Sequence, residues 1–288
     1  MSISSELGER RTVDLPQGTI AYRERGDGPP IVFVHGLWVN GDHWRKVVPL
    51  LADRYRCIAP DLPLGAHEIP MKPDADLTPP GHARLIADFI AALDLDDVTV
   101  VGNDTGDAFV QILVTEHPER ITRVVLTPGD AFTNFFPWSV KPARLLGFAP
   151  PLLKLAARGW RTRAGQFAIL AAIARNFPPR EIRDHYSRPA VENDGVRRDL
   201  QKFFRYASPR HTMRAARKLR QLRIPALVVW TRAPSFVFPK LHGRRLASII
   251  PDARLEHVSG LAFVSEDNPD RLAELIAEFV PVRERTAA

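Results

Sequence analysis

The sequence predicts an α/β fold in which a mostly parallel sheet of eight strands is flanked by helices. Short β-rich runs alternate with helical stretches, the pattern of parallel strands joined by helices. The 288 residues, 45% hydrophobic and 25% charged, suffice for one large α/β domain or two small ones. The apolar runs are far shorter than the roughly 20 residues of a membrane-spanning helix. A disordered, collagen-like or membrane-spanning chain is therefore excluded.

Eight runs carry the strand pattern, and the first two form a hairpin across Pro16-Gln17-Gly18. The strands are expected at residues 12–15, 19–25, 31–34, 56–60, 98–102, 123–127, 224–230 and 254–258. Helices are expected near residues 44–51, 78–93, 106–117 and 269–280. Thr78 before Pro79 and Asn268 before Pro269 mark two helix starts, because proline fits the first turn of a helix.

The alternation stops between residues 134 and 222. This segment is punctuated by proline, is rich in Ala, Leu and Arg, and predicts several helices with no strand between them. We therefore expect a core formed by residues 1–133 and 223–288, with residues 134–222 as a separate helical part. Residues 283–288 are expected to be a frayed tail.

Positive charge is concentrated in the helical part. The formal net charge is +7, and residues 141–220 hold 19 Lys or Arg against 5 Asp or Glu. Nucleic-acid binding would call for aromatic side chains interleaved with the charges or for a groove-reading motif, and neither is found. A solvated helical face is the better interpretation, and attraction of an anionic substrate or surface stays open.

The N-terminus and the cysteine content indicate the compartment. The first eleven residues carry both signs of charge without an apolar core or cleavage site, so no signal peptide is expected and a cytoplasmic protein is predicted. Cys57, the single cysteine, cannot form an internal disulfide and has no second soft ligand nearby. We expect it to be a buried strand residue, and we expect no metal and no cofactor.

The sharpest motif is the run Val100-Val-Gly-Asn-Asp-Thr-Gly-Asp107, a hydrophobic strand that leads through Gly-x-Asp-x-Gly into a helix. It predicts a nucleophile elbow with Asp104 in the place usually held by serine. Gly102 and Gly106 permit the tight turn, and Asp104 between them is expected to be strained and presented rather than buried. Gly and Asp are also ordinary turn residues, so the flanking strand and helix carry the functional interpretation.

Four phrases give the chain a resemblance to the α/β-hydrolase superfamily, in the branch of haloalkane dehalogenases and epoxide hydrolases. They are Phe33-Val-His-Gly36, Asp61-Leu-Pro-Leu-Gly65, Gly102-Asn-Asp-Thr-Gly106 and His117-Pro-Glu-Arg120. The resemblance implies an α/β-hydrolase fold in which residues 134–222 form a helical cap over the active site. It also implies an oxyanion hole formed by the backbone N–H groups of Leu37 and Thr105.

The same resemblance implies helper residues that this sequence lacks. In the family, an aspartate forms an alkyl ester, a histidine activates the water that hydrolyses it, and a second acid orients the histidine. Alignment on Glu266-Asp-Asn-Pro269 puts Ala262 at the histidine position, and Trp230-Thr-Arg-Ala-Pro-Ser235 holds no acid. Thr105 and Leu37 occupy the positions of the halide-binding pair, so halide release is not favoured.

Substitutes for the missing groups are few. Asp130 is a candidate second pocket acid, and Asp107 is either a pocket residue or a first-turn charge. His35 is expected to be structural beneath the oxyanion loop, and His257 to lie on the last strand facing solvent or a helix. The other histidines are expected on helical or loop surfaces: His43, His67, His82, His117, His185, His211 and His242. Tyr186 and Tyr206, possible proton donors to an epoxide, are by default core aromatics.

Three functions stay open at this point. The first is hydrolysis of a carbon–heteroatom or ester bond with Asp104 as nucleophile; the second is elimination, isomerisation or cyclisation with Asp104 as general base, on a scaffold repurposed naturally or by engineering. The third is an inactive relative that binds a small ligand.

The expected partner is a small apolar organic substrate, with no nucleic acid and no membrane insertion, and a homodimer is left open. The expected pocket lining is Trp38, Phe109, Phe132, Phe135, Phe136, Trp138 and Ala262.

Overall fold

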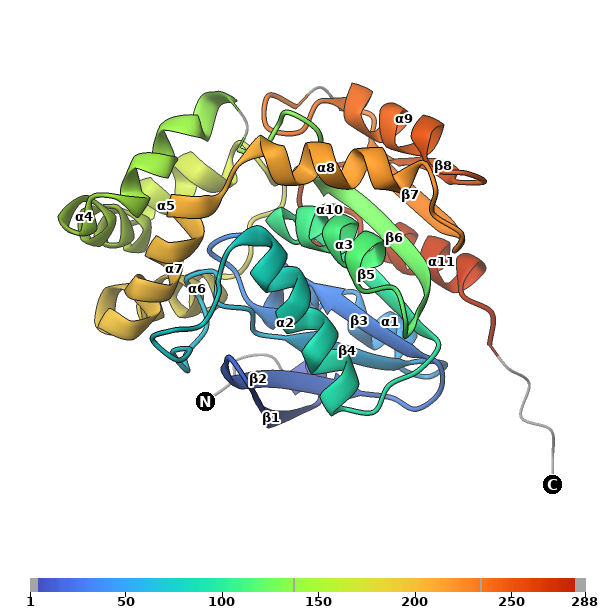
Figure 1. The fold of residues 1–288 in the computed structure, drawn as a ribbon. Coiled ribbons are helices and arrows are strands. Elements are labelled where there is room, and N and C mark those ends of the chain that lie inside the picture. The colour runs from blue at the N-terminus through green and yellow to red at the C-terminus, as the bar shows by residue number, and fades with distance from the viewer. Residues whose placement is uncertain (1–4, 137, 234, 283–288) are drawn as a thin grey trace.

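The computed structural model describes residues 5–136, 138–233 and 235–282, so the expected tail at residues 283–288 lies outside the described residues (Figure 1). Its sheet has eight strands in the order β1-β2-β4-β3-β5-β6-β7-β8, in which β2 pairs antiparallel with β1 and with β4, and all the other pairings are parallel. The predicted fold class is confirmed. The strands are β1 (Glu9–Leu15), β2 (Gly18–Arg25), β3 (Pro30–Val34), β4 (Arg56–Pro60), β5 (Val98–Asp104), β6 (Ile121–Gly129), β7 (Ala226–Thr231) and β8 (Arg254–Val258).

Helices cover both faces of this sheet (Figure 1). Alternate residues of β3 separate the two layers: Val32 and Val34 pack with the residues of α2, α3 and α8, whereas Ile31 and Phe33 pack with those of α1 and α11. The helices of the core are η1 (Ser5–Leu7), η2 (Gly41–Trp44), α1 (Val48–Leu51), α2 (Pro79–Ala92), α3 (Thr105–Glu116), α9 (Lys240–Ile249), α10 (Val264–Asp267) and α11 (Pro269–Phe279).

The helix starts follow the sequence signals in part. The Thr78 hydroxyl accepts the N–H of Gly81 at 3.1 Å and caps α2, as expected. The helix α11 begins at Pro269, but the Asn268 amide donates to Ser259 instead of capping it. The continuous helix expected at 44–51 is wrong: a 3₁₀ turn ends at Trp44, and a separate short helix begins at Val48. Proline near the start of this second helix has no N–H with which to continue the first turn.

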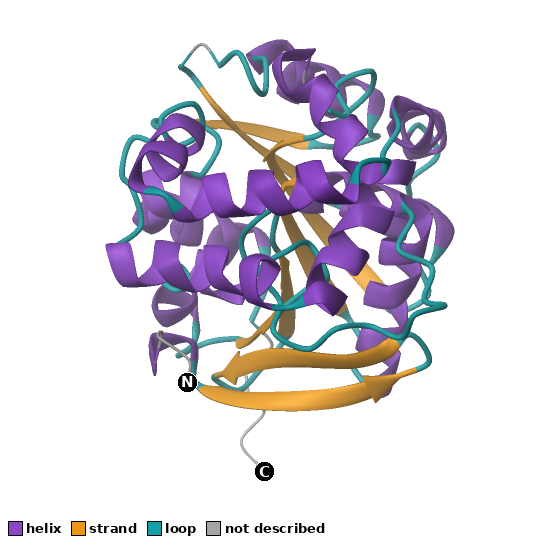
Figure 2. Ribbon diagram, turned by 90° about the vertical axis from the view of Figure 1, so that its left-hand side faces the viewer, coloured by secondary structure: helices purple, strands orange, loops and turns teal. Residues whose placement is uncertain are grey.

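Between β6 and β7 the described residues are helical and contain no strand, as the sequence predicts. Figure 2 shows the side of the molecule that lies at the left in Figure 1, where helices lie in front of the sheet. The helix α4 contacts η3, α5, α6 and α7, whereas α8 lies against α3 and α9. The helices of this segment, which we call the helical insertion (residues 134–222), are η3 (Trp138–Gly147), α4 (Pro150–Arg161), α5 (Arg163–Leu170), α6 (Arg180–Glu192), α7 (Asp194–Tyr206) and α8 (Pro209–Leu219).

Two further expectations concern the burial of Cys57 and the absence of a membrane-spanning helix. Cys57 on β4 is buried, as predicted, and burial raises the pKa of its thiol to about 12. In the described part of the chain, every helix is too short or too polar to span a bilayer.

Candidate active site

Asp104 stands at the junction of β5 and α3, where the sequence predicts the elbow. Its backbone has φ 57° and ψ −131°, a region that residues other than glycine rarely adopt. The expected strain is therefore present. Such strain persists only where the surrounding structure holds it, and it is common at functional sites.

Glycines allow the loop after β3 to approach this elbow closely. A Cβ atom at Gly36 would lie 2.3 Å from Asp104 Oδ1, and one at Gly106 would lie 2.4 Å from the carbonyl oxygen of His35. These positions require glycine because no side-chain carbon fits there. The tight approach brings the loop after β3 directly onto the Asp104 carboxylate.

Two backbone amides bind the same oxygen of that carboxylate. The N–H of Leu37 donates to Asp104 Oδ1 at 3.0 Å, and the N–H of Thr105 donates to it at 2.7 Å. These are the two N–H groups expected to form an oxyanion hole, and Oδ1 occupies the space between them. The other oxygen, Oδ2, is not held by either amide.

Asp104 is buried, with 9% of its surface exposed, so the expectation that it is presented rather than buried is wrong. The loop after β3 contacts its carboxylate through the N–H of Leu37, and the N–H of Asp130, after β6, donates to its backbone carbonyl at 3.1 Å. Neither contact could be inferred from the elbow motif alone. Burial raises the pKa of the Asp104 carboxyl, and the N–H groups of Thr105 and Leu37 partly oppose this effect.

Two more buried acids lie beside the elbow. The Thr105 hydroxyl donates to Asp130 Oδ2 at 3.1 Å. The side-chain amide of Gln111 donates to Asp107 Oδ2 at 2.8 Å and to the backbone carbonyl of Asp130 at 2.9 Å, and so links the two residues. Burial raises the pKa of Asp107 and of Asp130 well above 3.8, and the nearby Asp104 charge acts in the same direction. Asp107 is thus both a first-turn residue of α3 and a fully buried one.

His35 holds the loop beneath the elbow, as expected. The N–H of Leu62 donates to His35 Nε2 at 2.8 Å, so Nδ1 carries the proton and donates to the Gly36 carbonyl at 2.8 Å. Burial lowers its pKa to about 3. With both nitrogens engaged, this ring is a structural element and not a base.

Four histidines expected on surfaces are buried instead, and that expectation is wrong for them. His43 Nε2 lies 2.8 Å from Asn103 Oδ1 and 2.9 Å from Ser265 Oγ, and burial lowers its pKa to about 3. Its neighbour Trp44 is fully buried, and this bulky residue was the sequence signal that could have revealed the burial of the turn. The others lie at contacts between distant segments: His67 beside Asp199, His82 stacked on Phe109, and His185 near Asp42.

Asn103 is a residue of the site that sequence reasoning missed. Its side-chain nitrogen donates to Thr127 Oγ1 at 2.8 Å, to the Pro128 carbonyl at 3.0 Å and to the Ala262 carbonyl at 2.9 Å. It thereby joins the elbow to β6 and to the loop after β8. Among the described residues, no histidine forms a hydrogen bond with Asp104, and Ala262 supplies no titratable group.

Four of the expected lining residues pack against α7 of the helical insertion. Phe203 and Phe204 of α7 form the centre of an aromatic cluster, in which Phe109 lies 5.9 Å from Phe203 and Trp38 lies 6.4 Å from Phe204, ring centre to ring centre. Phe135 packs on Phe203, and Phe136 packs on Phe203 and on Phe204. Phe132 is directed elsewhere and packs against His242 and Arg245 of α9. The side chain of Trp138 lies outside the described residues.

The two tyrosines of the insertion differ. Tyr186 is a buried aromatic of α6, as expected. Tyr206 is 43% exposed, so its default assignment to the core is wrong. Tyr206 is the last residue of α7 and lies at the rim of a surface groove between α7 and residues 73–78.

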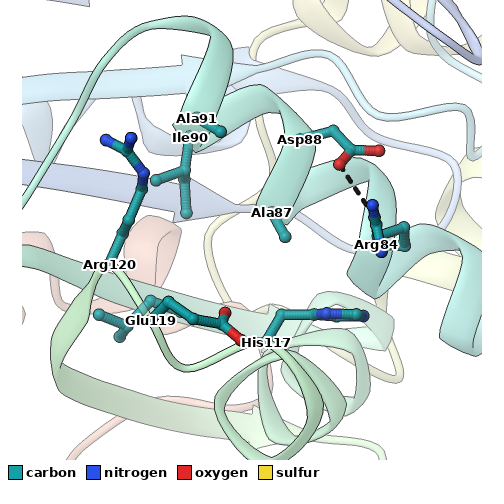
Figure 3. Close-up of a pocket in the computed structure, with 9 residues that line it drawn as sticks. Arg84, Ala87, Asp88, Ile90, Ala91, His117, Glu119 and Arg120 are labelled. Atoms are coloured by element: carbon teal, nitrogen blue, oxygen red, sulfur yellow. Dashed lines mark hydrogen bonds and ion pairs between the residues drawn. The ribbon is translucent and has the colours of Figure 1, made fainter.

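A surface pocket of about 260 Å³ lies between α2 and the end of α3 (Figure 3). Arg84 and Asp88 on its wall bond to each other at 2.9 Å, and His117 lies opposite on the loop after α3. Asp104 precedes the first residue of α3 and His117 follows the last of its 12 residues, so the pocket is roughly 18 Å along the helix from the elbow. It is not part of the candidate active site.

The elbow, the amides on its acid and the sheet order define a class of protein. Residues 31–275 match the alpha/beta hydrolase family, and the chain belongs to this family. Haloalkane dehalogenase 2 of Mycobacterium tuberculosis (strain ATCC 25618 / H37Rv) is 30% identical over 294 residues, which cover 94% of this chain and 94% of that protein. The resemblance to the dehalogenase and epoxide hydrolase branch is thus confirmed.

Solved structures agree on the fold. A putative lipase from Acinetobacter baumannii AYE superposes with a TM-score of 0.77 at 17% identity, covering 94% of this chain and 90% of its own. The epoxide hydrolase CorEH superposes with a TM-score of 0.76 at 18% identity, covering 94% of this chain and 98% of its own. At these identities the likeness establishes the shared fold alone.

Proposed function

We propose that this chain hydrolyses a carbon–heteroatom or ester bond of a small apolar substrate, with Asp104 as the covalent nucleophile. One observation carries the proposal: the amides of Leu37 and Thr105 both bind Oδ1 and leave Oδ2 to react. The hydrolase relatives support the reaction type. We propose the helical insertion as the cap, because its Phe203 and Phe204 meet the core aromatics.

The chemistry follows from the two oxygens. Asp104 Oδ2 forms a bond to the substrate carbon, and the leaving group departs with the bonding electron pair. Oδ1 becomes the carbonyl oxygen of the resulting ester. When water attacks Cγ, the negative charge develops on Oδ1, where the N–H groups of Leu37 and Thr105 stabilise it. Collapse breaks the bond between Cγ and Oδ2 and restores the carboxylate with the oxygen of the water; the released alcohol takes up one proton of the water, and the other proton passes to solvent.

The second half of this cycle is expected to be slow. Ala262 cannot remove a proton from water, and His35 and His43 are neutral and engaged in other hydrogen bonds. Asp130 is the candidate second acid, linked to the elbow by the Thr105 hydroxyl, but burial raises its pKa and so disfavours the carboxylate form that could act as a base. We therefore expect the ester to accumulate during turnover.

Proton abstraction by Asp104 is a second candidate, since burial raises its pKa and makes it a stronger base than a solvated aspartate. Elimination, isomerisation or cyclisation needs neither water nor histidine. However, the Leu37 and Thr105 amides are occupied by Oδ1 and cannot also hold an oxyanion of the substrate. This geometry ranks covalent attack first.

Intact-protein mass spectrometry tests the proposal. The parent, Asp104→Asn and Asp130→Asn are incubated with alkyl halides, epoxides and activated esters. An adduct on the parent and on Asp130→Asn, absent from Asp104→Asn, supports covalent catalysis. Product without an adduct, lost in Asp104→Asn, supports the general base. Calorimetric binding of these compounds to parent and Asp104→Asn alike, with no product from either, supports an inactive relative.

A further inference from the structure

The helical insertion contains a long stretch without negative charge. No Asp or Glu occurs from residue 131 to residue 180, and eight Lys or Arg do. This stretch forms η3, α4 and α5. Ordinary protein surfaces intersperse both signs of charge, so a cationic stretch of this length favours contact with negative charge. Two of its cations already have partners on α6, because Arg161 pairs with Glu192 and Arg180 with Asp184.

The helix α4 shows how this stretch is divided. Leu153, Ala157 and Trp160 are buried at the i, i+4, i+7 spacing of a helix face that packs inward. The outer side exposes Leu152 and Leu155, the latter 66% accessible to solvent. Lys154 and Arg158, four residues apart, are exposed on the same helix. The outer side of α4 is thus apolar and cationic together.

The neighbouring helices extend this pattern. Phe167 of α5 is 63% exposed and Leu145 of η3 is 65% exposed, and α4 contacts both α5 and η3. These helices lie together at the edge of the molecule in Figure 1, away from the sheet. We call this region the apolar cationic surface, defined by Leu145, Phe148, Leu152, Leu155, Phe167 and Ile169 with Lys154 and Arg158.

We propose that the apolar cationic surface docks the protein on an anionic lipid surface. Exposed leucine and phenylalanine side chains enter the boundary between headgroups and acyl chains, while Lys154 and Arg158 stay among the phosphates. The helices lie on the bilayer and do not cross it, in keeping with their length.

Charge argues against the other occupants. A second copy of the chain, docked through the same surface about a twofold axis, would place the exposed cations Lys154 and Arg158 against those of its partner. A nucleic acid would match the charge but would leave Leu152 and Leu155 without an apolar partner. Anionic lipid satisfies the apolar side chains and the cations at once.

Vesicle co-sedimentation tests this proposal, with phosphatidylcholine alone and with phosphatidylcholine mixed with phosphatidylglycerol. The parent is expected to bind the mixed vesicles and to leave phosphatidylcholine largely unbound. Lys154→Gln/Arg158→Gln is expected to weaken binding about thirtyfold, from the typical contribution of two cations near an anionic membrane. Leu152→Ser/Leu155→Ser, which keeps every charge, is also expected to weaken it.

The helix α9 offers matched controls. Lys240→Gln/Arg244→Gln removes two exposed cations at the same spacing, and Leu241→Ser removes an exposed leucine from the same helix. These controls are expected to bind like the parent, and all variants to keep the parent's melting temperature, because the substituted side chains are exposed.

Four outcomes overturn the proposal. The first is failure of the parent to bind mixed vesicles, and the second is equal weakening by the α4 and α9 variants. The third is a parent dimer, seen by light scattering, that Leu152→Ser/Leu155→Ser dissociates, because the surface would then face a second copy. Duplex RNA that displaces vesicles and binds more tightly would favour a nucleic acid instead.

Discussion

The side-chain amide of Asn103 donates a hydrogen bond of 2.9 Å to the backbone carbonyl of Ala262. Residue 103 immediately precedes the acid of the elbow, and residue 262 is the position at which the family resemblance places a histidine. The two positions lie 159 residues apart in the chain. The backbone that would carry the missing base is therefore held against the elbow.

Because of this contact, Ala262→His is expected to shorten the lifetime of the Asp104 ester. A positioned general base contributes about 10²–10⁴-fold to a rate. Ala262 is buried, so the larger side chain is expected to cost about 1–3 kcal/mol of stability. Decay of the adduct is followed by mass spectrometry, with Ala262→Gln as a control of comparable size that lacks a base. Equal decay in both variants would contradict a role for imidazole at this position.

Asp107 and Asp130 predict an unusual dependence of stability on pH. Burial raises the pKa of each carboxyl in the folded state above 3.8, so their protonated forms favour folding. This contribution is fully present below the unfolded-state pKa and is lost as pH rises through the folded-state pKa.

Asp107→Asn, which keeps the shape and removes the titration, is therefore expected to melt above the parent at about pH 8 and close to it at about pH 4. Exposed Asp74→Asn serves as the control and should follow the parent at both pH values. Parallel melting curves for Asp107→Asn and the parent across this range would show that folding does not raise the pKa of Asp107.

Gly36→Ala is expected to abolish most of the activity. The new Cβ would lie 2.3 Å from Asp104 Oδ1, so the carboxylate must leave the N–H groups of Leu37 and Thr105. A displacement of about 1 Å at a reacting group can cost about a hundredfold in rate. Gly159→Ala is a matched control, because a Cβ there meets nothing within 4 Å, and a helical Gly-to-Ala change stabilises by about 0.5–1 kcal/mol.

The ion pair of Arg45 and Glu266 is expected to stabilise α10, the short helix that follows Ala262. Both side chains are buried, and Arg45 Nη2 donates to Glu266 Oε2 at 2.7 Å. Glu266→Gln leaves a buried guanidinium without its counter-charge, at a cost of about 3–5 kcal/mol in denaturant unfolding. Glu274→Gln breaks the exposed pair with Arg271 and is expected to cost less than about 1 kcal/mol.

The sequence predicts the local features of this protein well. The strands and the elbow follow from hydrophobic runs, and the strain at Asp104 follows from two glycines within five residues. The burial of Asp104 depends on Leu37, 67 residues away, and could not be inferred locally. The burial of His43 could not be inferred locally either, since its partners Asn103 and Ser265 come from other parts of the chain.

The single buried thiol makes the chain suited to site-specific labelling. Cys57 is inaccessible and its raised pKa keeps it protonated, so a maleimide reagent finds no reactive thiolate in the native protein. A cysteine introduced at Leu155 would then be the one site labelled, without removal of any natural residue from the core. An environment-sensitive fluorophore there would report, in real time, the polarity that the outer side of α4 experiences.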